Sequence, residues 1–423
     1  MKTILLISLS LLCATNIMAQ TEMPDSIKTQ NLNEVVVEGQ LQTVKPAVST
    51  YLPGNNQKKS AQDAIDLLSQ MGIPQIQVNP VSYSVLTLNG QPVSIYIDMQ
   101  PASQEQLEAL RPEDVKKVEY LVYPTDPRYQ HKPYVVNFKL RRYEFGGYSK
   151  LTGRGNIMAG SGSGLAYGKL SYKRMTYDMI VSDKYTDRHN QGTDRTQIFR
   201  FPAADGTMKE VIRENKIGYS RLQQNNLGIS FRAIYGTDKM SISNILSLDA
   251  TNRPRLNSNG TVTFTPKIYQ TSDYISTSSS NVIYPTWTGN FYFDLGRNFQ
   301  LNTVTKLQYQ KTKSKSLYQG AGETAINTNA SDEAAMGQIM LQVNKAINER
   351  NVVDLQGYYI FNNDKVKYSG STISIERFHQ LAYGAMAGYT FQAEKFYGRF
   401  EGGLIGERNE INGMSVSDAV PLF

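Results

Sequence analysis

The residues that most often perform catalysis or bind metals are few in this chain and widely spaced. The three histidines are His131, His189 and His379, and none has a second metal-ligand residue at helical or hairpin spacing. The single cysteine is Cys13, so no thiol follows it that could form a disulfide or a zinc site. We therefore expect neither a metal nor a cofactor.

Two further groups have the composition of catalytic motifs but not their context. The glycine-rich segment 160–164 could suit a nucleophile elbow or a phosphate loop, but it lies between two strand patterns, where those motifs need a following helix. We interpret it as a turn. The carboxylates Asp98, Glu113, Asp114 and Asp126 are spread over predicted helix starts and turns, without an acid and base pair. The chain is not expected to be an enzyme.

The first residues have the order of a bacterial secretory signal peptide. Lys2 supplies a positive charge, residues 4–13 form a short apolar run, and Ala19 is a small residue at a suitable cleavage point. The apolar run is too short to span a bilayer as a helix. We therefore expect a signal peptide over residues 1–19 and export of the remaining chain.

Composition restricts how the exported chain can meet a membrane. The mean hydropathy is -0.41, and no apolar run of helical length follows the signal. A closed barrel of alternating strands is the remaining way to cross a bilayer, and the 27 tyrosines and 32 glycines suit it. The net charge of +7 comes from scattered lysines and arginines, without a basic helix. We expect these residues to face solvent and anionic lipid, and we expect no nucleic-acid partner.

Residues 143–423 alternate apolar and polar side chains over strand lengths, for example in 286–295 and 301–310. Tight turns are predicted at 173–176, 236–238, 296–298, 348–351 and 393–395. Long polar connections are predicted over 187–215, 251–285, 311–332 and 362–376. Short turns at one end and long loops at the other are typical of an outer-membrane β-barrel, with the short turns in the periplasm. A soluble β-sandwich or lipocalin-like barrel also alternates, but with its apolar face inside.

The number of strands suggests that the barrel is incomplete. Counting from residue 143 gives about eleven strands, the last over 396–411, whereas single-chain bacterial barrels have even numbers. Asp418 and Pro421 interrupt the alternation that a closing strand needs. We expect a truncated product with a partial barrel. The alternative is a small even barrel in which the strands are miscounted.

Residues 60–142 mix helix and strand patterns. We predict a helix capped by Ser60 that ends at Gly72, and a hairpin or a closely spaced strand pair of residues 81–88 and 93–97 around Asn89-Gly90. We also predict a capping box of Ser103 and Gln106 and strands over 115–123 and 134–140. These elements predict a small α+β domain. Residues 20–59 are polar and irregular, apart from the run Glu34-Val35-Val36-Val37. This composition predicts a flexible arm.

This order resembles that of the TonB-dependent outer-membrane receptors. The motifs that carry the resemblance are Leu32 to Gly39, Ala64-Ile65-Asp66-Leu67-Leu68 with Ile73-Pro74, Leu88-Asn89-Gly90, Val93 to Asp98, Leu110 to Val115, Val118 to Leu121 and Tyr134 to Leu140. Residues 123–133 lack the glycine pattern usual in that family. The chain is therefore similar to a divergent branch of it.

The resemblance implies an α+β plug followed by an antiparallel transmembrane β-barrel in the cell outer membrane. It implies a receptor that transports a scarce nutrient, with the TonB energy-transducing protein, outer-membrane lipid and an unidentified small ligand as partners. It also implies that Glu34, Val35, Val36 and Val37 are the TonB-interaction residues. Three β-branched valines favour an extended backbone, which can pair by its edge with another strand. The alternatives are a structural or adhesive barrel that does not transport and, less favoured, an outer-membrane enzyme.

The small apolar content of residues 60–142 predicts how the plug is held. We expect Leu67 and Leu68 to pack on the strands within 85–88 and 93–97. Because this core is small, we expect polar contacts from the barrel lumen to hold the plug in place.

Overall fold

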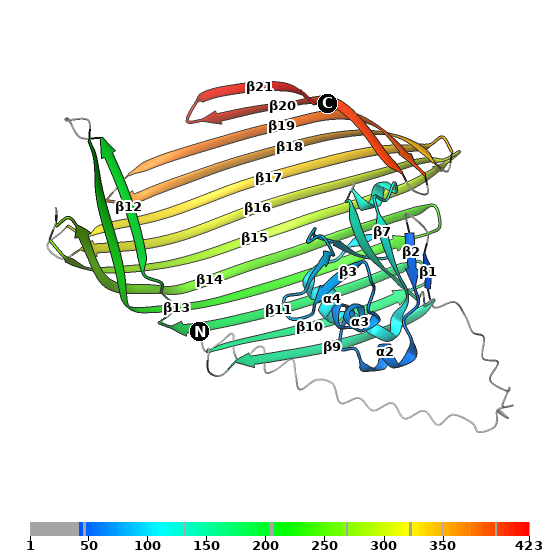
Figure 1. Cartoon of the computed structure of the whole chain (residues 1–423), viewed down its shortest axis with the longest axis horizontal. Helices are drawn as coiled ribbons and strands as arrows, with labels where there is room; N and C mark the ends of the chain where they lie inside the picture. The colour runs from blue at the N-terminus through cyan, green and yellow to red at the C-terminus, as the bar shows by residue number, and fades with distance from the viewer. Residues whose placement is uncertain are drawn as a thin grey trace. The chain divides into compact units, whose positions relative to one another are not determined.

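The computed structural model describes most of the chain after residue 41. The described residues are 42–44, 48–130, 132–141, 143–156, 158, 160–190, 192–202, 207–267, 270–320, 324–348, 350–371, 373–393 and 396–422. Residues 42–140 contain an α+β region, and a long antiparallel sheet follows it (Figure 1). The predicted signal peptide and the TonB-interaction residues Glu34, Val35, Val36 and Val37 lie outside the described residues.

The α+β region contains a six-stranded sheet, a two-stranded sheet and short helices. The strands of the larger sheet, in spatial order, are β1 (Gln42–Val44), β2 (Val48–Tyr51), β7 (Val115–Val122), β8 (Tyr134–Leu140), β5 (Ser94–Ile97) and β6 (Gln100–Pro101). The smaller sheet pairs β3 (Ile76–Asn79) with β4 (Ser84–Thr87). The helices are α2 (Asn55–Ser60), α3 (Ala64–Met71), α4 (Gln104–Ala109) and the 3₁₀ turns η2 (Pro112–Asp114) and η3 (Pro127–Tyr129). None of the described helices has the length and apolar character needed to cross a membrane.

Helix α3 is the element that the sequence pattern identified most clearly. At its start, the side chain of the N-cap residue Asp63 accepts a hydrogen bond from the Asp66 amide at 2.9 Å. At its end, Gly72 adopts the left-handed conformation at φ 59°. The predicted cap, Ser60, is wrong. Ser60 is the last residue of α2. Asp63 caps α3 because it directly precedes the first helical turn, where its carboxylate can accept a hydrogen bond from an amide that has no partner within the helix.

The strand pair predicted around Asn89-Gly90 forms only next to the turn, where the Val93 amide donates to the Val85 carbonyl at 3.0 Å and the Thr87 amide to the Gln91 carbonyl at 2.8 Å. Gly90 forms a turn at φ 76°, but β4 pairs with β3, and β5 pairs in parallel with β8. A single bridge between Leu86 and Pro92 joins the two segments. The pairing of β5 with β8 places β5 in the larger sheet, so tertiary packing overrides the local turn signal.

The core of the α+β region confirms the packing expected for α3. Leu67 and Leu68 are fully buried in one cluster with Val85, Val93 and Ile97. Burying each such side chain contributes about 1.5–3 kcal/mol. The predicted capping box of Ser103 and Gln106 and the strands over 115–123 and 134–140 are confirmed, to within one residue at their ends. The strands β1 and β2 and helix α2 lie in residues that the sequence pattern assigned to the arm.

The second sheet has thirteen strands and pairs them in chain order, except that β12 pairs only with β13. Its strands are β9 (Phe145–Asn156), β10 (Ser161–Tyr172), β11 (Met175–His189), β12 (Arg195–Pro202), β13 (Met208–Gly236), β14 (Met240–Thr265), β15 (Ser272–Gly296), β16 (Phe299–Gly320), β17 (Ile326–Ala346), β18 (Asn351–Gly370), β19 (Ser374–Gln392), β20 (Tyr397–Ile411) and β21 (Met414–Leu422). The described part of this sheet is open, with β9 and β21 as its edges (Figure 1). It is thus a wall of antiparallel strands and not a closed barrel.

The count of about eleven strands was too low by two. The eleven expected strands correspond to β9, β10, β11 and β13 to β20, and the additional strands are β12 and β21. Strand β21 forms despite Asp418 and Pro421. It lies at an edge of the sheet, where one side has no neighbour, and a proline costs least at such a position.

The predicted tight turns are confirmed in their described residues, but the long polar loops are wrong. Strands β13, β14 and β15 contain 29, 26 and 25 residues and occupy most of the segments assigned to the loops around them. Polar strand ends keep their backbone hydrogen bonds after the apolar alternation stops, so the hydrophobic pattern does not mark them. The segment 160–164 is likewise only partly a turn, since β10 begins at Ser161.

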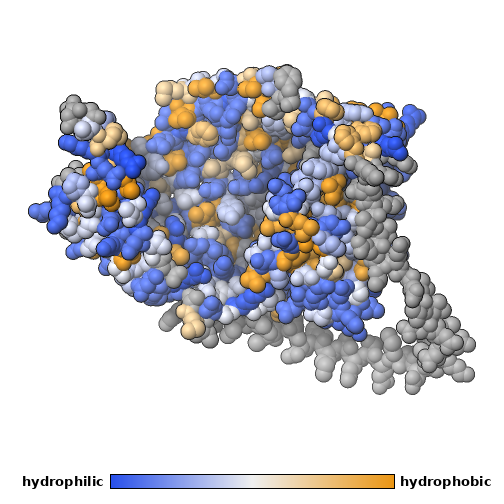
Figure 2. All heavy atoms as spheres, in the orientation of Figure 1, coloured by the Kyte–Doolittle hydropathy of each residue, from blue (hydrophilic) through white to orange (hydrophobic). Residues whose placement is uncertain are grey.

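The two faces of the thirteen-stranded sheet differ in polarity. Large apolar side chains are exposed on one face, among them Leu307, Tyr309, Ile339, Leu341, Val353, Leu355, Tyr359, Phe361, Tyr383, Tyr389, Phe400 and Leu404. Polar side chains are buried on the other, among them Asp178, Arg232, Ser243, Asn290, Asn302, Gln342, Asn344, Asp354 and Thr390. The hollowed surface in Figure 2 is correspondingly mostly hydrophilic. This is the reverse of a soluble β-sandwich, which buries its apolar face.

Candidate functional site

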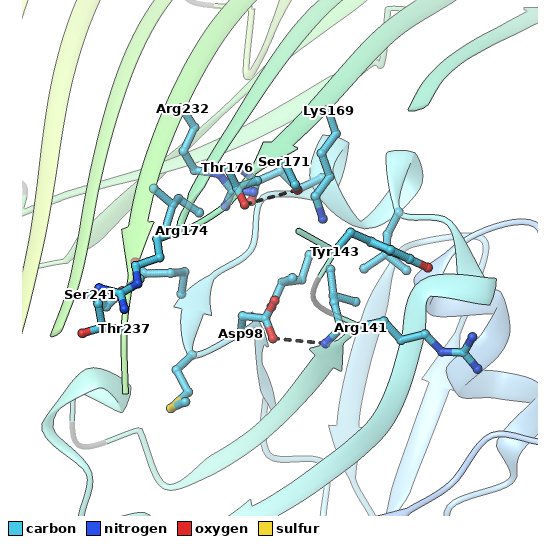
Figure 3. Close-up of a pocket in the computed structure, with 18 of the residues that line it drawn as sticks. Asp98, Arg141, Tyr143, Lys169, Ser171, Arg174, Thr176, Arg232, Thr237 and Ser241 are labelled. Atoms are coloured by element: carbon cyan, nitrogen blue, oxygen red, sulfur yellow. Dashed lines mark hydrogen bonds between the residues drawn. The ribbon is translucent and has the colours of Figure 1, made fainter. Parts of the chain in front are cut away.

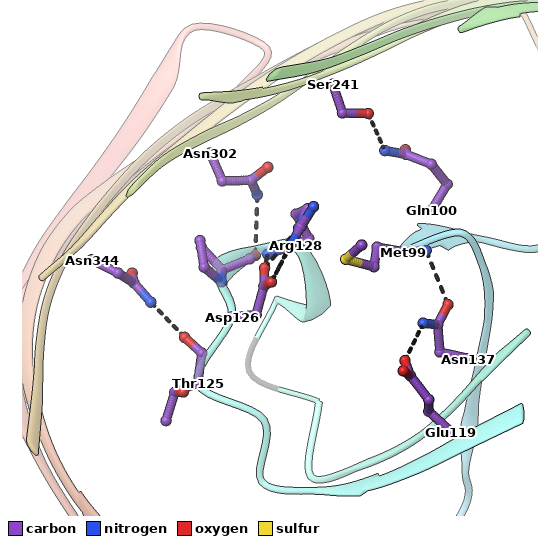
Figure 4. A network of polar contacts seen from close by, with 11 residues as sticks. Met99, Gln100, Glu119, Thr125, Asp126, Arg128, Asn137, Ser241, Asn302 and Asn344 are labelled. Carbon is purple, nitrogen blue, oxygen red and sulfur yellow. Dashed lines mark hydrogen bonds and ion pairs between the residues drawn. The ribbon is translucent and has the colours of Figure 1, made fainter. Parts of the chain in front are cut away.

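The α+β region meets the polar face of the sheet through the loop between β7 and β8. Asn344 donates a hydrogen bond from Nδ2 to the Thr125 carbonyl at 2.7 Å, and Asn302 donates to the Pro127 carbonyl at 3.2 Å (Figure 4). Asn302 and Asn344 lie on neighbouring strands, β16 and β17, and both are buried. These two hydrogen bonds therefore recognise the backbone of this loop.

The loop holds its shape through its own side chains. Asp126 accepts a hydrogen bond from the Arg128 amide at 3.0 Å and pairs with the Arg128 guanidinium, with Nε 2.9 Å from Oδ1 (Figure 4). The same guanidinium lies 4.0 Å from the centroid of the Tyr292 ring, on β15. Arg128 therefore fixes the conformation of η3 and contacts the wall of the sheet at once.

Two tyrosines pack η3 against the α+β core. The Tyr96 hydroxyl donates to the Tyr129 carbonyl at 3.2 Å, and the two rings are 5.1 Å apart in a T-shaped arrangement. Burial raises the pKa of Tyr96 to about 12 and also raises the pKa of Tyr129. Both side chains therefore remain neutral at physiological pH, as their buried positions require.

The turn between β5 and β6 makes a second polar contact. Asn137, which is fully buried, accepts a hydrogen bond from the Met99 amide at 2.9 Å and donates to Glu119 at 3.0 Å (Figure 4). Asp98 and Met99 have φ angles of 48° and 65°, so the chain reverses sharply here. Gln100 then reaches the sheet and donates to the Ser241 hydroxyl at 3.5 Å.

A third contact joins the end of α4 to β9. Lys150 donates from Nζ to the Glu108 carbonyl at 2.6 Å and to the Gln62 carbonyl at 2.9 Å. A cation at the end of a helix is favourable because the last carbonyls there lack partners within the helix. Arg154 pairs with the Glu108 carboxylate at 3.2 Å and donates to the Tyr83 hydroxyl at 3.2 Å.

These contacts make the interface mainly polar. Each hydrogen bond contributes only about 0.5–1.5 kcal/mol net, because water can replace either partner. The apolar part is a small cluster of Ala109, Leu165, Tyr167 and Ile180, with Tyr148 packed against it. An interface of this kind fixes one position for the α+β region but can be rehydrated when the region moves.

A cavity of 350 Å³ lies between the α+β region and strands β10, β11, β13 and β14 (Figure 3). Its charged lining residues are Asp98, Arg128, Arg141, Lys169, Lys173, Arg174, Arg232 and Asp238. Arg232 pairs with the buried Asp178 at 2.6 Å, and the Ser171 hydroxyl lies 3.4 Å from that of Thr176 (Figure 3). A polar cavity of this size can hold ordered water. The α+β region and the sheet are therefore not in direct contact at this place.

The residue types considered for catalysis are placed apart. His189 lies 2.9 Å from the Tyr219 hydroxyl, and His131 lies outside the described residues. Asp114 pairs with Arg111 at 2.6 Å, and Asp98 accepts a hydrogen bond from the Leu140 amide at 3.1 Å. In the part of the chain that the structure describes, no three histidine, cysteine or acidic residues are grouped so as to hold a metal ion.

No pattern in the sequence marks the interface residues specifically. Asn302 and Asn344 were recognisable only as polar positions in alternating strands, and their partners are backbone carbonyls 175 and 219 residues away. The TonB-interaction residues Glu34, Val35, Val36 and Val37 remain a prediction, since the structure does not describe them.

Comparisons with known proteins give limited similarity. No protein family model matches the chain. No curated protein matches it. Among solved structures, it is similar to the ferric yersiniabactin uptake receptor FyuA from Yersinia pestis, at 11% identity and a TM-score of 0.34, over 89% of this chain and 72% of that one. It is also similar to the siderophore receptor PiuA from Acinetobacter baumannii, at 11% identity and a TM-score of 0.32, over 87% of this chain and 64% of that one. For the ferric citrate transporter FecA the values are 10% and 0.31, over 86% and 67%.

Proposed function

We propose that this chain is an outer-membrane receptor of the TonB-dependent kind, which takes up a scarce small nutrient when its plug rearranges. In this proposal residues 1–19 are the signal peptide, 20–59 the periplasmic arm, 60–142 the plug and 143–423 the barrel wall. The observation that carries it is the position of the α+β region. That region contacts the polar face of a sheet whose other face is apolar, and it does so through exchangeable polar contacts.

The pairing order of the α+β region suggests how a pull on the arm would act. Strand β1 has three residues and, among the described strands, pairs only with β2, and β2 pairs with β7. Strand β7 continues into the loop that Asn302 and Asn344 hold. Force applied before Gln42 would first act on β1 and β2, and then on the loop that joins the plug to the sheet. Edge strands with few hydrogen bonds open most readily.

The proposal can be tested without knowing the nutrient, because the exported chain is expected to contain no cysteine. Ser243 is fully buried on the polar face of β14, two residues from Ser241, which contacts the plug. In cells that make the full chain with Ser243→Cys, we expect a membrane-impermeant maleimide to label this residue slowly. Labelling should accelerate when TonB is energised, and deletion of residues 32–39 should abolish the acceleration.

The matched control is Ser82→Cys, at an exposed position of the α+β region. Its labelling should be fast under all conditions. A photo-crosslinking amino acid at Val36 should in addition capture TonB. Equal labelling of Ser243→Cys with and without residues 32–39, together with no capture of TonB from position 36, would refute the energised mechanism.

A further inference from the structure

The apolar face of the sheet ends at a group of basic side chains. On β16 the exposed residues Leu307 and Tyr309 are followed, on the same face, by Lys311, Lys313 and Lys315. On β18 the exposed residues Tyr359 and Phe361 are followed by Asn363, Lys365 and Lys367. Side chains two residues apart on a strand share a face, so all these lysines lie on the face that exposes the apolar residues.

The register brings these side chains together across strands. Lys311 lies opposite Glu333, which lies opposite Lys365, and Lys365 lies opposite Arg377 on β19. In the next row Lys313 lies opposite Ser331, which lies opposite Lys367. Neighbouring strands are about 4.8 Å apart, and Lys313 and Lys367 are separated by two such spacings, so their backbones lie about 10 Å apart. We refer to Lys311, Lys313, Lys315, Lys365, Lys367 and Arg377 as the basic patch.

Negative charge within these rows is sparse. Glu333 forms an ion pair with Lys311, with Nζ 2.7 Å from Oε1. The rows that contain the patch otherwise carry serine, asparagine and isoleucine at the paired positions of β15, β17 and β19. Six cations around one carboxylate leave an excess of positive charge, and Lys313, Lys315, Lys367 and Arg377 are exposed. Such a surface favours an anion with several acceptor oxygens.

A groove lies on the same face directly beside the patch. It has a volume of 630 Å³ and includes Leu246, Trp287, Leu307, Tyr309 and Phe361 in its lining. Tyr309 is two residues from Lys311 on β16, and Phe361 is four residues from Lys365 on β18. A molecule in this groove would have an apolar part, and an anionic part attached to it would reach the basic patch.

We propose that the basic patch and the groove together bind a phosphorylated lipid, with the phosphate on the lysines and an acyl chain in the groove. This inference rests on the membrane position in the proposed function. The patch lies in the half of β16 remote from the short turn at 297–298, so the lipid belongs to the leaflet next to the long strand ends. Under the proposed orientation this is the outer leaflet.

The test uses the full chain in a non-ionic detergent and lipid A with two phosphates as the probe, with bound lipid measured by native mass spectrometry. Each lysine near an anionic lipid contributes about fivefold to affinity. Lys313→Ala with Lys367→Ala should therefore weaken binding by about 25-fold. The matched control, Lys209→Ala with Lys216→Ala, removes the same charge from exposed positions of β13 and should leave binding unchanged.

Lipid A freed of its phosphates should bind wild type and both variants equally and weakly. Undiminished binding of lipid A to the Lys313→Ala, Lys367→Ala variant would overturn the proposal. Displacement of lipid A by an equal concentration of inorganic phosphate would also overturn it, because the site would then recognise the free anion. The maleimide experiment at Ser243→Cys tests transport independently, so a failure of the lipid site and a failure of the proposed function give different results.

Discussion

Buried side chains of α3 support the α+β region at the scale of single residues. Leu67 has no exposed surface and lies in the main cluster of the α+β region. We predict that Leu67→Asp destabilises this region by a few kcal/mol, about 3, because it buries a charge without a partner. Hydrogen exchange of residues 64–140 in the full chain should rise strongly. Leu88→Asp, at a position 62% exposed, is the control and should leave exchange unchanged.

The two asparagines that hold the loop between β7 and β8 give a second prediction. Asn344→Ala removes the donor to the Thr125 carbonyl, and Asn302→Ala removes the donor to the Pro127 carbonyl. Each change should weaken docking by about 1–3 kcal/mol, since a partly buried carbonyl loses its partner. Hydrogen exchange at residues 123–130 should accelerate while that of α3 stays the same.

Gln338→Ala is the matched control for the two asparagines. Gln338 lies on the polar face of β17, six residues from Asn344 and therefore about 20 Å along the strand. Exchange of the loop should not respond to this change. A loop response equal to that of Asn344→Ala would show that the hydrogen bonds to the carbonyls are not what holds the plug.

Residue-scale features differed in how far sequence could reveal them. The apolar face of α3 was readable because its signal is local and repeats with helical spacing. The cap at Asp63 was missed in favour of Ser60, since both residue types suit that position. The roles of Asn302 and Asn344 could not be predicted, because their acceptors are backbone carbonyls, which every residue type carries.

At the scale of elements, strands were predicted where apolar alternation continued and missed where it stopped. The five short turns were found because turns follow directly on apolar strand ends. The outer parts of β13 to β19, together with β12, were assigned to loops because paired polar strands do not alternate in hydropathy. Strand β21 was missed because Asp418 and Pro421 interrupt its alternation. The hairpin around Asn89-Gly90 forms only next to its turn for a different reason, namely the pairing of β5 with β8.

Close strand approach at Gly260 yields an element-scale prediction. A Cβ at this position of β14 would lie 2.1 Å from the Lys216 carbonyl oxygen of β13, next to the register shift between Ile217 and Tyr219. We predict that Gly260→Val disrupts the pairing of β13 with β14 and lowers the amount of folded protein in the membrane, measured by protease resistance. Gly153→Val on β9 meets no atom within 4 Å and should be tolerated. Equal loss in both variants would point to valine itself and not to the close approach.

At the scale of the whole molecule, the single tryptophan reports which face meets lipid. Trp287 lies on the apolar face of β15, and its indole Nε1 donates to Asn244 at 3.2 Å. In vesicles made with lipids brominated on their acyl chains, we predict strong quenching of its fluorescence and weak quenching by acrylamide in the water. The Trp287→Phe variant is the control, because its remaining fluorescence comes from tyrosine. Strong acrylamide quenching with none by bromolipid would place this face in water and contradict the membrane orientation.

The separation along the chain of the plug contacts has a consequence for the order of folding. Nearly all strand pairs of the large sheet join consecutive strands, so the sheet can grow one hairpin at a time with small loop-closure cost. The hydrogen bond from Asn344 to Thr125 spans 219 residues and cannot form until β17 is in place. Pairing of the strands before β17 should therefore precede the fastening of the loop between β7 and β8. This late, long-range contact should set the rate at which that loop reaches its final position.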